Sequence, residues 1–451
     1  MKLSISIKSV IYTFFFISGF TGLIYEVTWT RLLSNIFGSN TYAVTSVLAA
    51  FMGGLAVGSY VIGRYVETKK DPLLLYAFLE IGIGITALLI PAIFSLLDLL
   101  YPLVYEHIAS SAGLLILTKV VLSLLVLLVP TFLMGGTLPV LSKLFIKKLK
   151  ESGKQVGILY SINTVGAAIG CFVTGFFLIE LLGIVKSIQL AAGVNLLLGA
   201  LFLILSIYVK KKNPETEITK IENRIKVVTE AAGYDSIRPF YSRLILIAFF
   251  MAGFISLSYE ILWTRLLVFK LKMTIYAFAI MLTTFLMGIG LGSIMVSILE
   301  KYKLIKDHTR AFGMIQSLIG LTGLLTIVLF SQIDVIPLFE TIGKFKPSIS
   351  WGKQIFTEVL LSGMIMIVPT LLMGMTFPIV SRVFTQDIKI VGKTIGSIYS
   401  INTIGSIFGS SLTGFFFVKT FGTQNNIIFI SLVAITIGTA IVLFNRKGLN
   451  K

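Results

Sequence analysis

Three glutamates lie inside long apolar segments of this sequence, where an ionisable side chain could do chemistry. Glu26, Glu80 and Glu260 are each flanked by runs of apolar residues. Placing such a group inside a membrane costs roughly 2–3 kcal/mol or more, so one that is kept there indicates a function by default. A carboxylate in apolar surroundings can bind a cation or carry a proton. We therefore expect these glutamates to bind a substrate or to couple proton movement to it. The alternative is a buried ion-pair network that locks the helices together.

Two of these glutamates occur in the same local motif, Tyr-Glu-x-x-Trp-Thr-Arg. Its aromatic and basic members are Tyr25, Trp29 and Arg31 in the first copy and Tyr259, Trp263 and Arg265 in the second. Aromatic faces hold organic cations by cation–π contact, so we predict that these rings line the same site as the carboxylates. Glu26 and Arg31 lie about 140° apart around one helix. Arg31 therefore either extends toward the membrane surface or pairs with Glu260 of the other copy.

Other polar residues inside apolar segments also match between the two copies of a repeat. Glu80 matches Gln316, so only one of these two positions can titrate, which favours a proton carrier or a cation ligand at Glu80. Four more charges match with exchanged sign. We predict two ion pairs with a structural or gating role, and their members are Lys119 with Glu180 and Glu358 with Lys419.

The elements that must position these residues are membrane helices. Hydrophobic residues make up 56% of the 451 positions and charged residues 13%, whereas a soluble domain has about a quarter charged residues. Runs of 20 or more apolar residues are long enough to cross a bilayer core of roughly 30 Å. We predict an all-α integral membrane protein with about twelve helices. The predicted spans are residues 9–35, 40–64, 73–98, 113–146, 152–182, 184–209, 243–269, 274–299, 309–332, 352–386, 392–421 and 424–444.

An internal repeat divides the chain into two six-helix halves. SGFTGLIYEVTWTRLL and AGFISLSYEILWTRLL share ten of sixteen positions, and PTFLMGGTLP and YSINTVG recur in the same order as PTLLMGMTFP and YSINTIG. An even number of helices per half gives both halves the same orientation, as in major-facilitator transporters. The predicted parts are a first half over 1–209, a cytoplasmic linker over 210–242 and a second half over 243–451.

Prolines and glycines indicate where helices bend and where they approach each other. The fourth and tenth spans each contain two prolines, which predicts a kink or a break. Glycine pairs spaced by four residues let helix backbones approach closely. They form either a sliding surface between moving halves or static packing, and they are Gly54 with Gly58, Gly166 with Gly170, Gly288 with Gly292 and Gly405 with Gly409.

The basic residues that give the formal charge of +18 are distributed as in a membrane protein. Lys and Arg gather in alternate loops, in the linker and at the C-terminus, while intervening loops such as residues 34–40 and 105–113 carry none. This positive-inside pattern predicts a multi-pass protein of the bacterial cytoplasmic membrane with both termini in the cytoplasm, and no nucleic-acid partner. The first apolar run is too long for a cleavable signal peptide. Cys171, His107 and His308 have no metal-site spacing, and we expect no metal and no cofactor.

These motifs together resemble the membrane domain of the fused major-facilitator/spermidine-synthase-like proteins of bacteria. The resemblance rests on the Tyr-Glu motif, FMGGLAVGS, LEIGIG around Glu80, PTFLMGGTLP and YSINTVG, and it covers nearly the whole chain. It implies a link to polyamines or similar cationic metabolites. The soluble synthase domain of that family, with its glycine loop and catalytic acid, has no counterpart in this sequence, so we expect no enzyme activity.

The leading hypothesis is a proton-coupled secondary transporter for polyamine-like or other small organic cations. It would work by alternating access between the two halves, with membrane lipid and a small cationic metabolite as its partners. The alternative is a non-catalytic membrane subunit that anchors or feeds a separate soluble spermidine-synthase-like transferase. A lipid-handling role is a third and weaker option.

Overall fold

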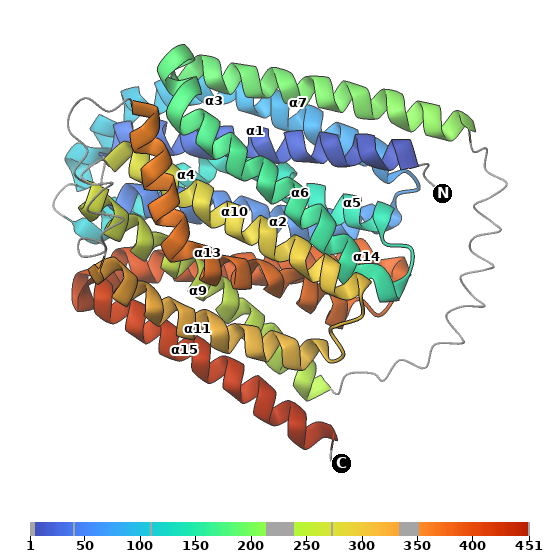
Figure 1. Cartoon of the computed structure of the whole chain (residues 1–451). Coiled ribbons are helices and arrows are strands. Elements are labelled where there is room, and N and C mark those ends of the chain that lie inside the picture. Colours follow the sequence, from blue (N-terminus) through green and yellow to red (C-terminus); the bar gives the residue numbers. More distant parts are fainter. Residues whose placement is uncertain are drawn as a thin grey trace.

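The computed structural model describes almost the whole chain as helices (Figure 1). The described segments are residues 5–38, 41–108, 111–212, 239–271, 274–332 and 351–449. Most of the predicted linker, residues 213–238, lies outside them. The first copy of the repeat holds α1 (Ile5–Phe37), α2 (Thr41–Tyr65), α3 (Pro72–Ile108), α4 (Ala112–Gly135), α5 (Thr137–Phe145), α6 (Ser152–Val173) and α7 (Ile179–Lys212). The second holds α9 (Pro239–Leu271), α10 (Thr274–Lys301), α11 (His308–Gln332), α13 (Trp351–Phe384), α14 (Val391–Leu412) and α15 (Val418–Leu449).

Short helical turns join several of these helices. They are η1 (Val66–Thr68), η2 (Leu149–Glu151), the π-helical η3 (Thr174–Leu178), η4 (Ile388–Ile390) and the π-helical η5 (Thr413–Phe417). Within the described residues, 10 segments are long and apolar enough to cross a membrane, and two of these are 63 and 58 residues long. Each long segment turns back at a glycine with positive φ, Gly183 (77°) or Gly422 (73°), a conformation that only glycine adopts readily. Each therefore supplies two crossings, which confirms the predicted all-α membrane fold of about twelve helices.

The same helix pairs pack together in both copies of the repeat. In the first copy α1 packs on α6, α2 on α4, and α3 on α7; in the second α9 packs on α14, α10 on α13, and α11 on α15. The copies then meet each other through α2 against α14 and α6 against α10. Serine hydroxyls bond to backbone at both interfaces: Ser59 Oγ donates to the Gly396 carbonyl and Ser297 Oγ to the Lys154 carbonyl, each over 3.0 Å.

The eight predicted packing glycines all face helices of their own half. A Cβ on Gly58 would lie 1.8 Å from the carbonyl oxygen of Phe132, and one on Gly166 would lie 2.1 Å from that of Phe16. The others also meet their own half, Gly54 and Gly288 at a threonine hydroxyl, and Gly170, Gly292, Gly405 and Gly409 at a backbone carbonyl. Static packing inside each half therefore explains these glycines, and a sliding surface between the halves does not.

This close packing predicts a specific loss of stability. In Gly58→Ala the new methyl group would overlap backbone of α4, which cannot rotate away, so we expect the variant to lose about 1–3 kcal/mol of stability. Gly193→Ala is the matched control, because it lies on an exposed face of α7 with nothing within 4 Å of a Cβ. It should gain stability or stay unchanged, since alanine favours helix. Thermal unfolding in detergent compares the two, and equal melting temperatures would contradict the packing argument.

The predicted interruption of the two proline-containing spans is found in the first copy. There α4 ends at Gly135 and α5 begins at Thr137. In the second copy α13 runs as one helix through Pro369 and Pro378. The sequences differ at this point, because the first copy has a second glycine, Gly136, where the second has Met375. Gly136 itself keeps helical dihedrals (φ −77°, ψ −18°), so the interruption is one residue wide.

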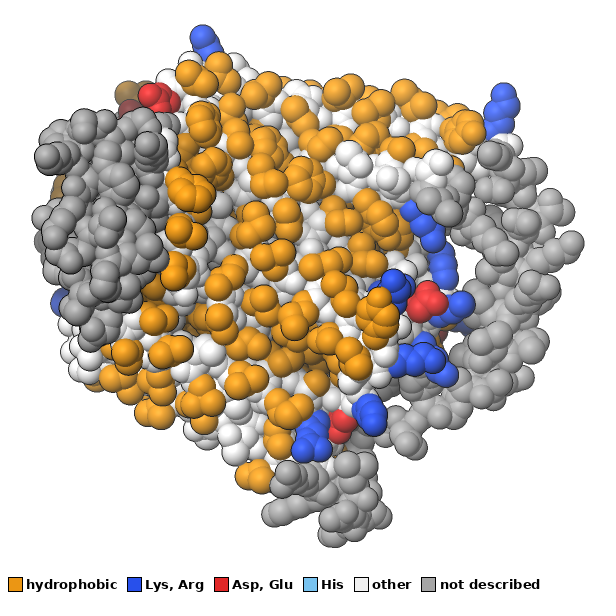
Figure 2. All heavy atoms as spheres, in the orientation of Figure 1, with side chains coloured by type: hydrophobic (Ala, Val, Ile, Leu, Met, Phe, Trp, Pro, Cys, Tyr) orange, Lys and Arg blue, Asp and Glu red, His pale blue; other side chains and the backbone are white. Residues whose placement is uncertain are grey.

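The surface is divided into an apolar band and a basic end. Hydrophobic side chains cover the broad middle of the face in Figure 2, and Lys and Arg gather at its right side. We call this side the basic end. Both described ends of the chain, the start of α1 and the end of α15, lie on it (Figure 1).

Candidate functional site

A cavity of about 210 Å³ lies between the two halves at the centre of the molecule. Its walls come from α1, α2, α3, α4, α5, α6 and α7 of the first half and from α9, α10 and α14 of the second. A cavity of this size suits a small metabolite rather than a drug-sized ligand. No Lys, Arg or His belongs to its described lining.

Two carboxylates face this cavity from matching positions of the two halves. Glu26 on α1 is 5% exposed and Glu260 on α9 is 4% exposed, and both line the cavity. Among the described residues, neither carboxylate has a hydrogen bond or an ion pair. Buried charges are normally paired, so two negative groups without a partner favour a cationic ligand.

The YSINT motifs add polar groups that sequence analysis missed. Each copy places a tyrosine, an asparagine and a threonine in the cavity wall, and they are Tyr160, Asn163 and Thr164 on α6 and Tyr399, Asn402 and Thr403 on α14. Asn163 donates to the Phe15 carbonyl (3.2 Å) and Asn402 to the Phe249 carbonyl (3.0 Å), which fixes both side chains. We used the motif only to detect the repeat. Its spacing of i, i+3 and i+4 on one helix face was the signal that could have identified these residues.

The predicted aromatic faces are only partly in the cavity. Tyr25 lines it, whereas Trp29, Tyr259 and Trp263 are fully buried outside its lining. Each tyrosine stacks on the tryptophan of its own motif, with ring centres 5.0 Å apart in the first copy and 4.9 Å in the second. The structure does not place either tryptophan in the cavity lining, and contact with a cation stays a prediction. Both tryptophans and Tyr259 lie behind the cavity wall.

Glu80 lies one layer behind the cavity wall, in a hydrogen-bond chain. It is fully buried on α3. Ser18 Oγ donates to its Oε1 (2.6 Å), and Asn195 Nδ2 donates to its Oε2 (2.5 Å). The Tyr25 hydroxyl donates in turn to Asn195 Oδ1 (2.8 Å). Ser18, Asn195 and Tyr25 all line the cavity, so this chain connects Glu80 with the site.

The matching position of the second half has no such chain. Gln316 is fully buried, and both of its amide atoms are without a hydrogen-bond partner among the described residues. The partners of Glu80 are replaced by apolar residues, since Ala252 matches Ser18 and Ala434 matches Asn195. The two halves thus share Glu26 and Glu260 but differ around Glu80.

The structure does not show the ion pairs predicted for Arg31 and Lys119. Arg31 is half-buried and forms no ion pair with Glu260, so of the two expectations for Arg31 that pairing is wrong. Arg265 is exposed. Lys119 donates to the Phe37 carbonyl instead (2.7 Å).

The predicted pair of Lys119 with Glu180 is not formed. Lys119 is buried, while Glu180 is exposed at the start of α7, where the chain has just left η3. Glu358 is buried on α13 and Lys419 is exposed on α15. The pairing of these two stays a prediction.

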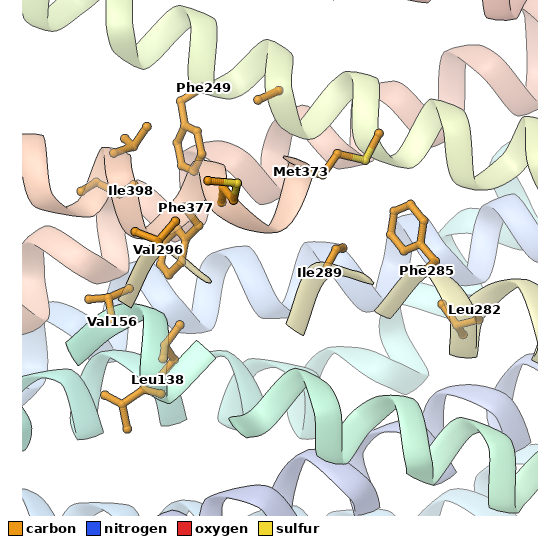
Figure 3. Close-up of a cluster of buried hydrophobic side chains, with 14 of the residues drawn as sticks. Leu138, Val156, Phe249, Leu282, Phe285, Ile289, Val296, Met373, Phe377 and Ile398 are labelled. Carbon is orange, nitrogen blue, oxygen red and sulfur yellow. The ribbon is translucent and has the colours of Figure 1, made fainter. Parts of the chain in front are cut away.

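The two halves touch on both sides of the cavity. Toward the basic end, Phe377 of α13 lies between Tyr160 and Tyr399, with ring centres 5.0 and 5.7 Å away. Figure 3 shows the apolar cluster around Phe377, with Leu138 and Val156 of the first half beside it.

Polar contacts reinforce this closure at the basic end. Glu67 forms an ion pair with Lys143 and accepts a hydrogen bond from the backbone N–H of Lys393 in the other half (3.1 Å). At the opposite end Phe176 of η3 stacks on Tyr276 of α10, with ring centres 5.3 Å apart. The structure therefore holds the cavity between two contact layers.

Solved structures of transporters share this arrangement of helices. The crystal structure of the human organic anion transporter MFSD10 (TETRAN) is similar over 95% of this chain and 98% of its own, with 11% identity and a TM-score of 0.57. Structures of a POT family transporter in complex with 5-aminolevulinic acid and with a thioalcohol-conjugated peptide are each similar over 96% of this chain and 95% of that chain. Their identities are 15% and 16%, and both TM-scores are 0.54.

Sequence comparisons add nothing to this structural likeness. No protein-family profile and no curated protein sequence matches the chain. The resemblance to the fused spermidine-synthase-like proteins is therefore not confirmed. At these identities the likeness to solved structures concerns the fold alone. The chain is an all-α membrane protein with the fold of major-facilitator transporters.

Proposed function

We propose that the chain is a secondary transporter that exchanges a small organic cation for protons by alternating access. The two halves would rock about the central cavity, so that the contact layers at the basic end and at the opposite end open in turn. Two observations support this: the fold is that of known transporters, and the cavity lies between the two halves.

The proposed substrate class is supported by one observation, the pair of cavity glutamates Glu26 and Glu260. They occupy equivalent positions in one small cavity with no basic group in its described lining. A substrate with an ammonium group at each end, such as a short diamine or another polyamine-like cation, could neutralise both carboxylates at once. The hydroxyl and amide groups of the YSINT motifs would accept its remaining N–H groups.

We place the protein in a bacterial cytoplasmic membrane, with the basic end facing the cytoplasm. The positive-inside distribution supports this orientation, which puts both termini on the cytoplasmic side. Glu67 and Lys143, together with the apolar layer around Phe377, would then form the cytoplasmic gate.

Uptake into proteoliposomes with an acidic interior tests the proposal. Labelled putrescine should accumulate as protons leave, spermidine should compete, and butylamine, with one ammonium group, should compete more weakly. Succinate, a dianion, should not compete. Absence of flux and of binding with a well-folded protein would overturn the cation proposal. A soluble transferase that then co-purifies would favour a membrane subunit instead.

A further inference from the structure

Within the described part of the chain, Glu80 is the one of the three membrane glutamates whose carboxylate accepts hydrogen bonds from the protein. Ser18 and Asn195 hold its two oxygens, and Tyr25 donates to Asn195. We propose that Glu80 binds the exchanged proton, and that Asn195, Tyr25 and Ser18 transmit its protonation state to the cavity so that proton and cation bind in alternation. This inference rests on the proposed transport function, and it assigns the coupling to one half of the molecule.

The chain as observed fits an ionised Glu80. A carboxylate only accepts hydrogen bonds, and the Ser18 hydroxyl and the Asn195 amide nitrogen both donate to Glu80. The amide oxygen of Asn195 is then turned toward Tyr25 and accepts its hydroxyl proton. With its hydrogen engaged in this way, Tyr25 leaves oxygen lone pairs for the cavity that it lines.

Protonation of Glu80 reverses the direction of this chain. A proton on Oε2 would meet the N–H of Asn195, and two donors cannot bond to each other. For a proton that points along this bond, the amide of Asn195 turns over, so that its oxygen accepts from Glu80 and its nitrogen donates to the Tyr25 oxygen. The Tyr25 hydrogen is then released toward the cavity. A proton on Oε1 would release the Ser18 hydrogen in the same way, and Ser18 also lines the cavity.

The reversal of this hydrogen-bond chain determines whether protonation of Glu80 strengthens or weakens cation binding. With Glu80 ionised, a third negative charge lies near the cavity and Tyr25 offers an acceptor to an ammonium group. With Glu80 protonated, that charge is lost and a hydrogen-bond donor faces the ammonium donors instead. The cation therefore binds better when the proton has left, and by linkage the bound cation expels the proton. This is the relationship that exchange of one for the other requires.

The titratable groups that face Glu80 are two tyrosines, while Glu26 and Glu260 lie in the cavity lining. Tyr76, one turn earlier on α3, and Tyr25 on α1 are the titratable groups that face it, and α7 brings the neutral Asn195. The helices α4 and α5 also pack on α3. Their lysines are engaged elsewhere, Lys119 with the Phe37 carbonyl and Lys143 with Glu67.

The second half supplies a natural control for two members of the chain, Tyr25 and Glu80. Tyr259 matches Tyr25, but its hydroxyl bonds to Ser431 (2.6 Å) and reaches no titratable group. Gln316 matches Glu80 and cannot bind a proton at neutral pH. A variant in the first half can therefore be compared with the same change in the second.

The affinity for putrescine, measured by calorimetry as a function of pH, tests the coupling. In the wild type, affinity should fall on acidification by up to about tenfold per pH unit for each proton that competes with the cation. Glu80→Gln should make this dependence shallower by about one proton, leaving the part due to protonation of Glu26 and Glu260; Tyr25→Phe and Asn195→Ala should weaken it, while Tyr259→Phe should behave as the wild type. An equal effect of Tyr25→Phe and Tyr259→Phe would overturn the transmission through Asn195.

Infrared difference spectroscopy without any substrate separates the two proposals. Acidification should produce a carboxylic-acid C=O band that is missing in Glu80→Gln, shifted in Asn195→Ala and unchanged in Gln316→Leu. An unchanged band in a well-folded Glu80→Gln variant would place the proton elsewhere and overturn the inference. The Glu80 band together with no binding of any cation would instead disprove the proposed function and leave the proton site standing.

Discussion

Replacing both Glu26 and Glu260 with glutamine is expected to abolish binding of a diamine by this protein. Both carboxylates are buried and without a partner among the described residues, so each would contribute a charge-assisted contact in a medium of low dielectric. Removing one partner of such a pair costs roughly 2–5 kcal/mol. Either single variant should therefore weaken putrescine binding by about thirtyfold or more. The double variant should show no binding in calorimetry.

A monoamine and an exposed carboxylate provide the controls. Butylamine carries one ammonium group, so the double variant should lose its binding too, but each single variant should retain part of it. Glu180→Gln, an exposed glutamate of α7, should leave both affinities unchanged. Full diamine affinity in either single variant would contradict the assignment, since it would show that one of these carboxylates does not contact the substrate.

Local sequence patterns were sufficient to predict the fold. The apolar runs of spanning length predicted a boundary between the fifth and sixth spans at residue 183, and Gly183 makes the turn there. The same holds for Gly422 in the second copy. These features depend on neighbours within a few residues, which is the range over which one sequence is informative.

The partners of Glu80 depend on contacts that no local pattern carries. Ser18 is 62 residues away along the chain and Asn195 is 115 residues away. A serine or an asparagine in an apolar helix has no signature that tells which neighbouring helix it faces. The repeat indicated that Glu80 matches Gln316. Only the packing of α1 and α7 on α3 shows that the partners of Glu80 change with it.

The sequence also did not show which side of each helix faces the cavity. Tyr25 and Trp29 share a helix face by spacing, so both were predicted to line the site, yet only Tyr25 does. The pairing of Lys119 with Glu180 failed for a related reason. Both lie toward the same end of their helices, but η3 and the turn at Gly183 leave Glu180 exposed.

A disulfide between the halves at either contact layer is expected to stop transport. At the end opposite the basic one, a Cβ on Gly414 would lie 3.1 Å from Cβ of Thr45. At the basic end, a Cβ on Gly153 would lie 2.9 Å from Cβ of Arg382. Disulfides need about 3.5–4.5 Å, so small shifts would bring each cysteine pair into range. The pairs would be made in a Cys171→Ala background, because Cys171 is the protein's one cysteine.

Oxidation of either pair should reduce putrescine flux at least about tenfold, because alternating access requires each layer to open in turn. Reduction should restore the flux, and each single-cysteine variant should be insensitive to oxidant. Binding measurements distinguish loss of transport from loss of the binding site. A protein locked by the disulfide can still bind putrescine from one side of the membrane although its flux is lost. Undiminished flux with a disulfide confirmed by mass spectrometry would mean that the layer does not open during transport. In that case the substrate would have to enter the cavity by a route other than separation of the two halves.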